Sequence, residues 1–218
     1  MRVYHFVNEE HEIGNLRRKR LKIANLTELN DPFELFGVEM SNNQVRRAFE
    51  KMKRELSENR GILCFSEDWS NPVVWSHYAN HHKGLCLGFE VPDECLGQVH
   101  YSRKRLVADL EKLSNPSSLA LDEARKFLFT KYSHWRYEKE HRSFVTLEDK
   151  DPETGLYFVD FSDRLRLESV IVGARSTASR ADIRSALGEL ATGVEVFKAR
   201  LAFKKFKVVR QRKQQLWV

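Results

Sequence analysis

The sequence predicts an α+β fold, a single domain over residues 1–218 with a mixed, largely antiparallel β-sheet, whole or split, flanked by helices. Apolar runs of strand length are interspersed with segments whose apolar residues recur at helical spacing. Their order has no regular strand–helix–strand rhythm, which disfavours a parallel α/β sheet. A chain of 218 residues can bury a substantial core in one domain, and no Pro-, Gly- or Ser-rich stretch has the character of a linker.

The first half of the chain supplies most of the expected strands. Residues 2–7 and the shorter run 21–24 are predicted strands. Between residues 42 and 59, four apolar residues recur at helical spacing and predict an amphipathic helix: Val45, Phe49, Met52 and Leu56. Apolar runs at 62–66 and 85–91 are of strand length, so both are predicted strands.

The second half mixes helices and strands. The breaker-rich stretch 114–118 separates two predicted helices, around residues 103–113 and 118–132. Strands are predicted near 141–147, 156–161 and 168–172. Ser179 and Asp182 stand at capping-box spacing before a helix near 181–190, and a basic strand is expected to close the chain.

The composition is that of a soluble globular protein, with 41% hydrophobic and 31% charged residues. No apolar run approaches the roughly 20 residues that a membrane span requires. The first residues lack the apolar segment of a secretory signal. Cys64, Cys86 and Cys95 show no metal-ligand spacing, so we expect reduced core thiols in a cytoplasmic protein.

The net charge of +6 and the pI near 9.2 raise the question of an acidic partner such as nucleic acid. Much of the excess lies in residues 17–20 and in a C-terminal stretch. That stretch contains Arg200, Lys204, Lys205, Lys207, Arg210, Arg212 and Lys213. A solvated basic edge strand is the more frequent reason for such a run, and we favour it, although basicity alone does not decide.

Residues 75–90 carry the most distinctive pattern in the chain. Two large aromatic residues, Trp75 and Tyr78, and three histidines stand just before a buried strand. Ligand pockets combine apolar walls with a few directional polar groups. This segment is therefore predicted to line a pocket.

The same histidines invite a comparison with metal sites. His77 and His81 are four residues apart and would share one face of a helix, where Glu67 could complete a metal-dependent nuclease or hydrolase. The chain has no H-E-x-x-H pattern, so we expect no metal. It also lacks a Walker loop, a GxGxxG loop and a Gly-x-Ser-x-Gly elbow, which removes support for a serine or cysteine nucleophile.

His5 is a candidate on the first strand. Strand alternation places it on the face that Val3 and Val7 share. A core histidine held by a backbone partner is the commoner situation. A functional His5 would donate a hydrogen bond to a ligand hydroxyl while its other nitrogen is fixed by a second group.

A turn around Pro32 adds a candidate substrate loop made of Asn30, Asp31, Phe33 and Glu34. Asn and Asp favour turn starts, Pro fixes φ, and the residue before Pro is held extended. We expect a rigid loop with Phe33 tucked inward, and a structural turn is the main role for most of it.

The segment from Trp135 to Arg142 brings charged residues into a predicted strand. If it is extended, Glu138, Glu140 and Arg142 share one face. Half-buried carboxylates one step apart would have perturbed pKa values, and Arg142 would keep at least one ionised. An exposed charge ladder is the alternative, but Trp135 and Tyr137 favour partial burial.

Taken in order, these motifs resemble a widespread bacterial family known only as a domain of unknown function. The matching segments are YHF at 4–6, LNDPFE at 29–34, ILCFSE at 62–67, WSHYA at 75–79, HKGLCLGF at 82–89 and WRYEKEHR at 135–142. The resemblance covers residues 4 to about 175. It implies a core of residues 1–175, followed by a helix and basic strand in 176–218, and carries no activity by itself.

The order of His5, Tyr78 and a late-strand glutamate is also similar to the His–Tyr–Glu arrangement of ADP-ribosyltransferases, closest to the DNA-targeting toxin and RES-type branches. That resemblance implies an ADP-ribosyltransferase-like fold with NAD as substrate. Cleavage of NAD at nicotinamide passes through an oxocarbenium-like ribose. Glu140, or else Glu138, would stabilise the developing positive charge.

The resemblance also implies an NAD-binding set, which consists of Tyr4, His5, Trp75, Ser76, Tyr78, Lys83 and Arg142. Tyr78 or Trp75 would hold the cationic nicotinamide by stacking and cation–π attraction. His5 would bind a ribose hydroxyl, and Lys83 or Arg142 would neutralise the pyrophosphate. The motif here is Trp-Ser-His-Tyr rather than the family's tyrosine motif, so both aromatic residues stay candidates.

We therefore expect an NAD-dependent ADP-ribosyltransferase or NAD glycohydrolase, a toxin or phage-defence effector whose basic surface recruits a nucleic-acid or protein acceptor. The alternative is a non-enzymatic nucleic-acid-binding module. In it, Phe203, Phe206 and Trp217 would stack on bases beside the C-terminal cations.

Overall fold

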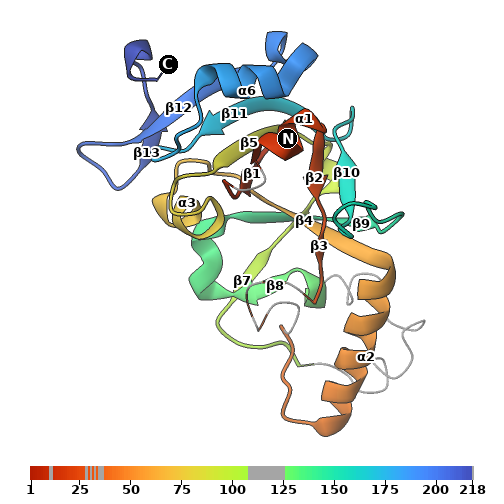
Figure 1. The fold of residues 1–218 in the computed structure, drawn as a ribbon. Coiled ribbons are helices and arrows are strands. Elements are labelled where there is room, and N and C mark those ends of the chain that lie inside the picture. The colour runs from red at the N-terminus through yellow and green to blue at the C-terminus, as the bar shows by residue number, and fades with distance from the viewer. Residues whose placement is uncertain are drawn as a thin grey trace.

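The computed structural model describes residues 1–9, 12–27, 29, 31, 33, 37–107 and 126–217. In these residues the predicted α+β class is confirmed, with a mostly antiparallel open sheet and several helices (Figure 1). No helix among them is long and apolar enough to cross a membrane.

Nine strands form the main sheet, in the order β13-β12-β11-β5-β1-β4-β9-β6, with β3 added beside β4. They are β1 (Arg2–Val7), β3 (Ala24–Asn25), β4 (Arg60–Ser66), β5 (Leu85–Glu90), β6 (Gly97–Gln98), β9 (Glu140–Thr146), β11 (Arg166–Val172), β12 (Glu195–Leu201) and β13 (Val208–Arg210). Only β11 and β12 run parallel among these pairs.

Two short ladders and a few helices complete the described fold. The ladders join β2 (Arg20–Lys22) to β10 (Phe158–Asp160) and β7 (His100–Ser102) to β8 (Thr130–Tyr132). The α-helices are α1 (Glu12–Arg17), α2 (Asn43–Asn59), α3 (Pro72–Tyr78) and α6 (Arg180–Leu187). The 3₁₀ turns are η1 (Asp93–Cys95), η3 (Ser133–Glu138), η4 (Gly188–Thr192) and η5 (Gln214–Leu216). Figure 1 shows α6, β12 and β13 at one end of the molecule and α2 at the other.

The main sheet opens between β1 and β4. β1 pairs with β5 over six residue pairs and β4 with β9 over seven, whereas β1 and β4 meet at the single pair Tyr4 and Ser66. The sheet is therefore two well-paired halves joined at one point. The opening lies beside residues 4–6 and 64–66, which the sequence singles out.

Both faces of β5 are covered, which explains its continuous apolar run. Leu87 and Phe89 belong to the main core cluster, which also contains Ile183 of α6. Cys86 lies on the opposite face, in a second cluster built around the fully buried Trp75. The three cysteines are free thiols.

The capping-box prediction for α6 is confirmed. The Ser179 hydroxyl accepts a hydrogen bond from the Asp182 N–H at 3.1 Å, and the Asp182 carboxylate accepts one from the Ser179 N–H at 3.0 Å. Each end of the box satisfies a backbone donor that the first turn of a helix leaves free.

Other element predictions were wrong or incomplete. The run 21–24 divides between β2 and β3, and the basic closing strand is a pair, β12 and β13. Residues 108–125 of the two central predicted helices lie outside the described residues. At the described ends, Leu106 bridges Val38, residues 126–128 are helical as predicted, and residues 130–132 form β8. Pairing of β8 with β7 outweighs the helical pattern there.

Substitution of glycines tests how closely the backbone just before β5 approaches the end of β1. A Cβ at Gly84 would lie 2.0 Å from the Val7 carbonyl oxygen, whereas one at Gly14 in α1 meets nothing within 4 Å. We expect Gly84→Ala to lower the free energy of unfolding by about 1–3 kcal/mol, as overpacking does. Gly14→Ala should raise it by about 0.5–1 kcal/mol because helix propensity improves. Urea unfolding measures both, and equal effects would contradict the close approach of Gly84 to Val7.

Candidate functional site

A cavity of about 250 Å³ lies at the opening between β1 and β4. Its wall is mostly apolar and aromatic, and one lysine and two glutamates are its charged groups. The lining residues are Tyr4, His5, Phe6, Ala24, Leu29, Cys64, Phe65, Ser66, Val74, Tyr78, Lys131, Glu138 and Glu140. The structure thus brings together five residues that the sequence selects from distant segments: Tyr4, His5, Tyr78, Glu138 and Glu140.

The His5 ring contacts the backbone of β4 across the opening. Its Nδ1 lies 2.9 Å from the Cys64 carbonyl oxygen. A carbonyl only accepts, so Nδ1 carries the proton and Nε2 is an acceptor. Burial lowers the pKa of His5 and keeps the ring neutral. The expected donor role toward a ligand is therefore reversed, because Nε2 would accept a hydrogen bond from a ligand hydroxyl.

A hydrogen-bonded chain of ionisable side chains forms the polar end of the cavity. The Tyr78 hydroxyl donates to Glu138 Oε1 at 2.5 Å, and Lys131 Nζ donates to Glu138 Oε2 at 2.7 Å and to Glu140 Oε2 at 2.9 Å. Arg142 donates through Nε to Glu140 Oε1 at 2.8 Å and through Nη2 to Oε2 at 3.1 Å. The side chains of Lys131, both glutamates and Arg142 are all at most 6% exposed.

The two carboxylates have opposite pKa shifts. Burial raises the pKa of Glu138, and the charge of Glu140 adds to this, although Lys131 and Tyr78 oppose it. Burial also acts against ionisation of Glu140, but Arg142 and Lys131 outweigh it and lower its pKa to about 2. Paired acids whose surroundings separate their pKa values are typical of acid–base sites.

The prediction that Glu138 and Glu140 share one strand face was wrong for Glu138. Glu138 ends the 3₁₀ turn η3, and Lys139 follows in the left-handed region with φ of 46° before β9 begins at Glu140. The Ser66 hydroxyl donates to the Glu138 carbonyl at 2.6 Å and fixes this turn. The left-handed residue turns Lys139 to solvent and lets both carboxylates reach Lys131.

Helix α3 positions Tyr78 against η3. Asn71 caps α3 by accepting from the Val73 N–H at 2.9 Å, and Pro72 occupies its first turn. The Asn71 amide also donates to the Tyr137 carbonyl at 3.1 Å. The same cap therefore starts the helix and ties it to the turn that carries Glu138.

Lys131 is the functional candidate that sequence reasoning missed. It lies in β8 within an apolar and aromatic run, Phe127 to Tyr132, and is buried. A lysine is almost never fully buried unless it is paired. A lone lysine in such a run was the available signal, and it was hidden because the segment was assigned to a helix.

Trp75 lies in the core rather than in the cavity wall, which corrects its predicted role. It is fully buried, its Nε1 donates to the Trp69 carbonyl at 2.5 Å, and Phe6 meets it edge-on at 5.2 Å. Arg142 is 1% exposed beneath Glu140 and so supports the site without lining it. Ser76 lies on α3 and Lys83 in the following turn.

The histidine-rich turn after α3 serves to change the direction of the backbone. Asn80, His81 and His82 have φ values of 41°, 54° and 70°, and Asn and His adopt this left-handed conformation more readily than most residues. The His82 ring stacks on Trp75 with an interplanar angle of 7°. Among the described residues, no group of three or more His, Cys, Asp or Glu side chains is placed to hold a metal ion.

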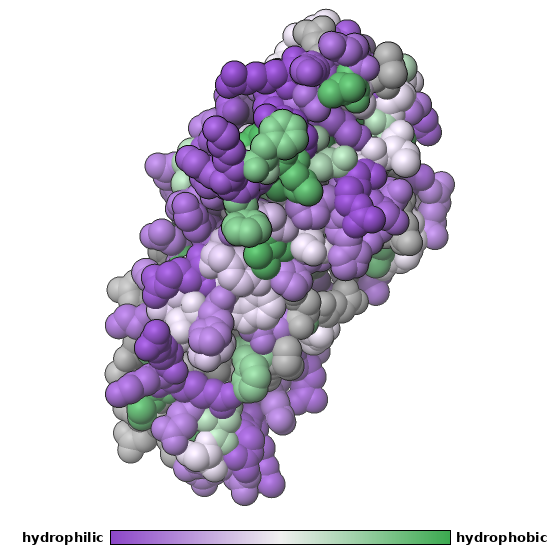
Figure 2. Space-filling model, turned by 90° about the vertical axis from the view of Figure 1, so that its left-hand side faces the viewer, coloured by the Kyte–Doolittle hydropathy of each residue, from purple (hydrophilic) through white to green (hydrophobic). Residues whose placement is uncertain are grey.

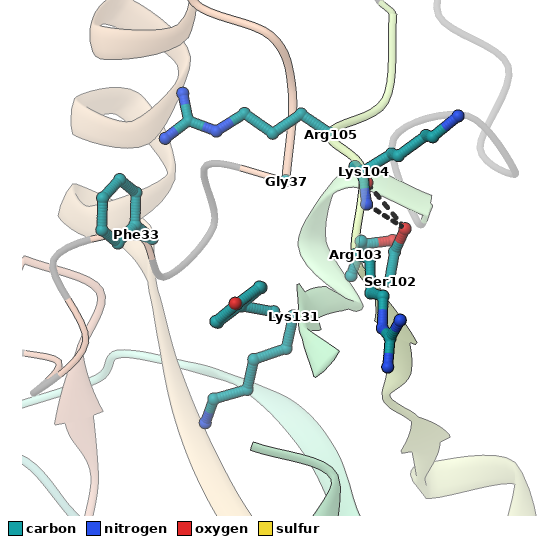
Figure 3. Close-up of a pocket in the computed structure, with 9 residues that line it drawn as sticks. Phe33, Gly37, Ser102, Arg103, Lys104, Arg105 and Lys131 are labelled. Carbon is teal, nitrogen blue, oxygen red and sulfur yellow. Dashed lines mark hydrogen bonds between the residues drawn. The ribbon is translucent and has the colours of Figure 1, made fainter. Parts of the chain in front are cut away.

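A second, basic pocket of about 270 Å³ adjoins the cavity through Lys131 (Figure 3). Its described lining includes Arg103, Lys104, Arg105 and Phe33 and no carboxylate. Lys131 lines both the cavity and the basic pocket, and the amino end of its side chain points away from Arg105 (Figure 3).

Phe33 is 58% exposed, so the prediction that it is tucked inward was wrong. The Arg105 guanidinium lies 5.0 Å from the centre of the Phe33 ring, which makes Phe33 part of the basic pocket's wall. Asp31 is buried and accepts from the Phe33 N–H at 2.9 Å, as the predicted turn requires. Asn30 and Glu34 lie outside the described residues.

Comparisons of the chain with protein-family models, with curated proteins and with solved structures found no match.

The buried cluster predicts an unusual dependence of stability on Lys131. We expect Lys131→Met to lower the free energy of unfolding at pH 7 by about 3–5 kcal/mol, because it leaves buried carboxylates without their cation. The loss should be smaller at pH 5, where Glu138, with its raised pKa, takes up a proton more easily. Urea unfolding at both pH values measures this. Lys126→Met, at an exposed position, is the control and should change stability by less than about 0.5 kcal/mol.

Proposed function

We propose that the cavity between β1 and β4 cleaves the glycosidic bond between nicotinamide and ribose in NAD, as an ADP-ribosyltransferase or an NAD glycohydrolase. The observation that carries the proposal is the convergence of His5, Tyr78, Glu138 and Glu140 on one cavity with an aromatic wall. An ADP-ribosyltransferase-like fold is part of the same proposal. It is supported by a sheet that opens where these residues meet.

The walls suit a flat cationic ring. Tyr4, Phe6 and Tyr78 line the cavity, and aromatic faces attract cations through their quadrupoles. The charges of Glu138 and Glu140 are balanced by Lys131 and Arg142, so the cluster is neutral when all four are ionised. A cationic nicotinamide can therefore enter without meeting an excess of positive charge.

Glu138 suits the reactive role better than Glu140, which the sequence had favoured. Glu140 accepts from Arg142 and Lys131 and, with a pKa of about 2, stays ionised. Glu138 has a raised pKa and accepts a hydrogen bond from the hydroxyl of Tyr78, one of the two residues predicted to stack on nicotinamide. We therefore assign proton transfer to Glu138. The role assigned to Glu140 is to hold Lys131 in position.

The reaction then proceeds with one bond broken and one formed. Nicotinamide leaves with the electron pair of the ribose C1′–N bond, and positive charge develops on C1′ and the ring oxygen. Ionised Glu138 stabilises that charge and takes the proton of the incoming hydroxyl, from water or from an acceptor. The neutral His5 ring accepts a hydrogen bond from a ribose hydroxyl through Nε2.

The basic pocket provides a place for the pyrophosphate. It shares Lys131 with the cavity, and Arg103, Lys104 and Arg105 present cations there. Arginine pairs with phosphate oxygens in a fixed, bidentate geometry. This assignment replaces Lys83 and Arg142, because Arg142 is buried against Glu140.

The catalytic assignment predicts the effect of one substitution on nicotinamide release. Glu138→Gln should lower kcat/KM for NAD by at least about 100-fold, the range of a lost acid–base group. In the wild type, kcat/KM should rise with pH through a midpoint above about 4.3, the ordinary glutamate value, because Glu138 acts ionised and its pKa is raised. Tyr78→Phe removes a donor that lowers this pKa, so its midpoint should move to higher pH.

Glu94→Gln is the matched control, since Glu94 is an exposed glutamate of η1 outside the cavity. It should leave nicotinamide release unchanged. If the wild-type protein releases no nicotinamide with candidate protein and nucleic-acid acceptors present, and NAD does not raise its melting temperature, the proposal is wrong.

The pyrophosphate assignment has a separate kinetic signature. Arg103→Ala with Arg105→Ala should raise KM for NAD by about tenfold or more while kcat changes little, because the lost contacts hold the ground state and the transition state alike. Nicotinamide mononucleotide, which lacks the second phosphate, should be affected less. Arg54→Ala on the exposed side of α2 serves as the control. An unchanged KM in the double variant would remove the basic pocket from the site.

A further inference from the structure

A third concave region lies at the far edge of the main sheet. A pocket of about 310 Å³ is bounded by β12, β13 and the C-terminal segment. Its lining includes five cations, which are Arg180, Lys198, Arg210, Arg212 and Lys213. No carboxylate is among the described lining residues. Glu195, at the start of β12, pairs with Arg210 at the margin of the pocket.

The loop between β12 and β13 adds two exposed aromatic side chains. Phe203 and Phe206 are 92% and 98% exposed, beside Lys204, Lys205 and Lys207, which are also exposed. Figure 2 shows the side of the molecule that includes this end of the sheet, with small green apolar areas bordered by purple hydrophilic residues. Exposed Phe at this level is not needed to protect an edge strand, since lysines alone would do that.

The loop and the pocket are close along the β12–β13 ladder. Leu201 pairs with Val208 at the loop end, and Ala199 pairs with Arg210 at the edge of the pocket. Two strand residues span about 7 Å. A single extended partner can therefore contact the pocket and the loop together.

The basic run at residues 17–20 is partly neutralised by carboxylates. Arg18 donates to Glu153 and Arg20 to Asp151, each at 2.6 Å. At the loop, Asp68 attracts Lys207 electrostatically. This attraction offsets less positive charge than the hydrogen-bonded ion pairs of Arg18 and Arg20 do. Residues 195–218 contain eight lysines and arginines and one carboxylate, Glu195, so this segment has a strong excess of positive charge.

We propose that the β12–β13 loop and its adjoining basic pocket bind single-stranded nucleic acid, with Phe203 and Phe206 stacking on unpaired bases and the cations contacting phosphates. Aromatic side chains that stack on bases beside a basic groove are the usual means of binding single strands without sequence preference. An anionic membrane would meet only the protruding loop, because a bilayer surface cannot enter the concave pocket. A duplex would keep its bases stacked and offer Phe203 and Phe206 no exposed base faces.

Trp217, which was predicted to stack on bases, is buried and therefore does not do so. Trp217 is 6% exposed, its Nε1 donates to the Ala178 carbonyl at 2.9 Å, and Arg180 lies over its ring at 4.9 Å. It is a wall of the pocket and holds Arg180 in place. This inference does not depend on the proposed NAD chemistry, because the residues of the two sites differ.

The test measures fluorescence anisotropy of a labelled 20-nucleotide oligo-dT strand with the full chain, over a range of salt concentrations. Phe203→Ala with Phe206→Ala should weaken binding by at least about fivefold, the lower end for one lost stack, and leave the salt slope unchanged. Lys204→Glu with Lys205→Glu should also weaken binding and flatten the slope of log K against log salt by about 1.4, or about 0.7 per lost phosphate contact.

The control reverses two exposed arginines of α2 at the opposite end of the molecule, Arg47→Glu with Arg54→Glu, and so makes the same change in net charge. Its affinity should stay closer to wild type. The proposal is overturned if the strand does not bind, if duplex binds as tightly as single strand, or if the two Phe→Ala changes have no effect. It is also overturned if anionic phosphatidylserine vesicles bind through Phe206 while oligo-dT does not.

Discussion

The opening between β1 and β4 is the constraint on which the rest of the site depends. Wherever two strands diverge, the backbone groups that faced each other must find other partners. Here Tyr4 and Ser66 form the one pair that joins the two halves of the sheet, and His5 supplies a side-chain nitrogen to the Cys64 carbonyl. The ring is thereby fixed in one tautomer. The hydrogen bond that His5 makes to the sheet thus leaves Nε2 as an acceptor for a ligand.

The charged cluster at the same opening is stable only as a unit. Each carboxylate faces Lys131, and removing one member would leave a buried charge without its partner. The two glutamates also act oppositely on stability. The lowered pKa of Glu140 contributes stability above its ordinary pKa, and this is lost as pH falls toward 2. The raised pKa of Glu138 works the other way, because its ionisation at higher pH weakens the folded state. A site that is held together by Glu140 can therefore keep Glu138 poised for proton transfer.

The sequence predicted the residues of the cavity better than their geometry. His5, Tyr78 and the two glutamates were found because each stands in a local pattern that is unusual for its surroundings. The positions of Trp75 and Lys131 were not, since they depend on contacts between segments far apart in the chain. Trp75 turned inward because α3 packs its buried side on the sheet, and Lys131 entered the site because β8 pairs with β7. The left-handed Lys139, which sets the position of Glu138, has no signature of its own in the residue types.

Trp75 links the two surfaces of the molecule in a way that no single motif suggests. Phe6, which lines the cavity, packs on Trp75, and Trp75 holds the Trp69 carbonyl, while Trp69 packs on Phe197 of the basic pocket at β12 and β13. In the strand order, β12 is four spacings from β4, or about 19 Å, so the two sites share no residue. What they share is this densely packed cluster, which must stay closed for either wall to keep its shape. Within the motif that the sequence singles out as a pocket wall, Tyr78 lines the cavity and Trp75 forms the core on which two pockets are built.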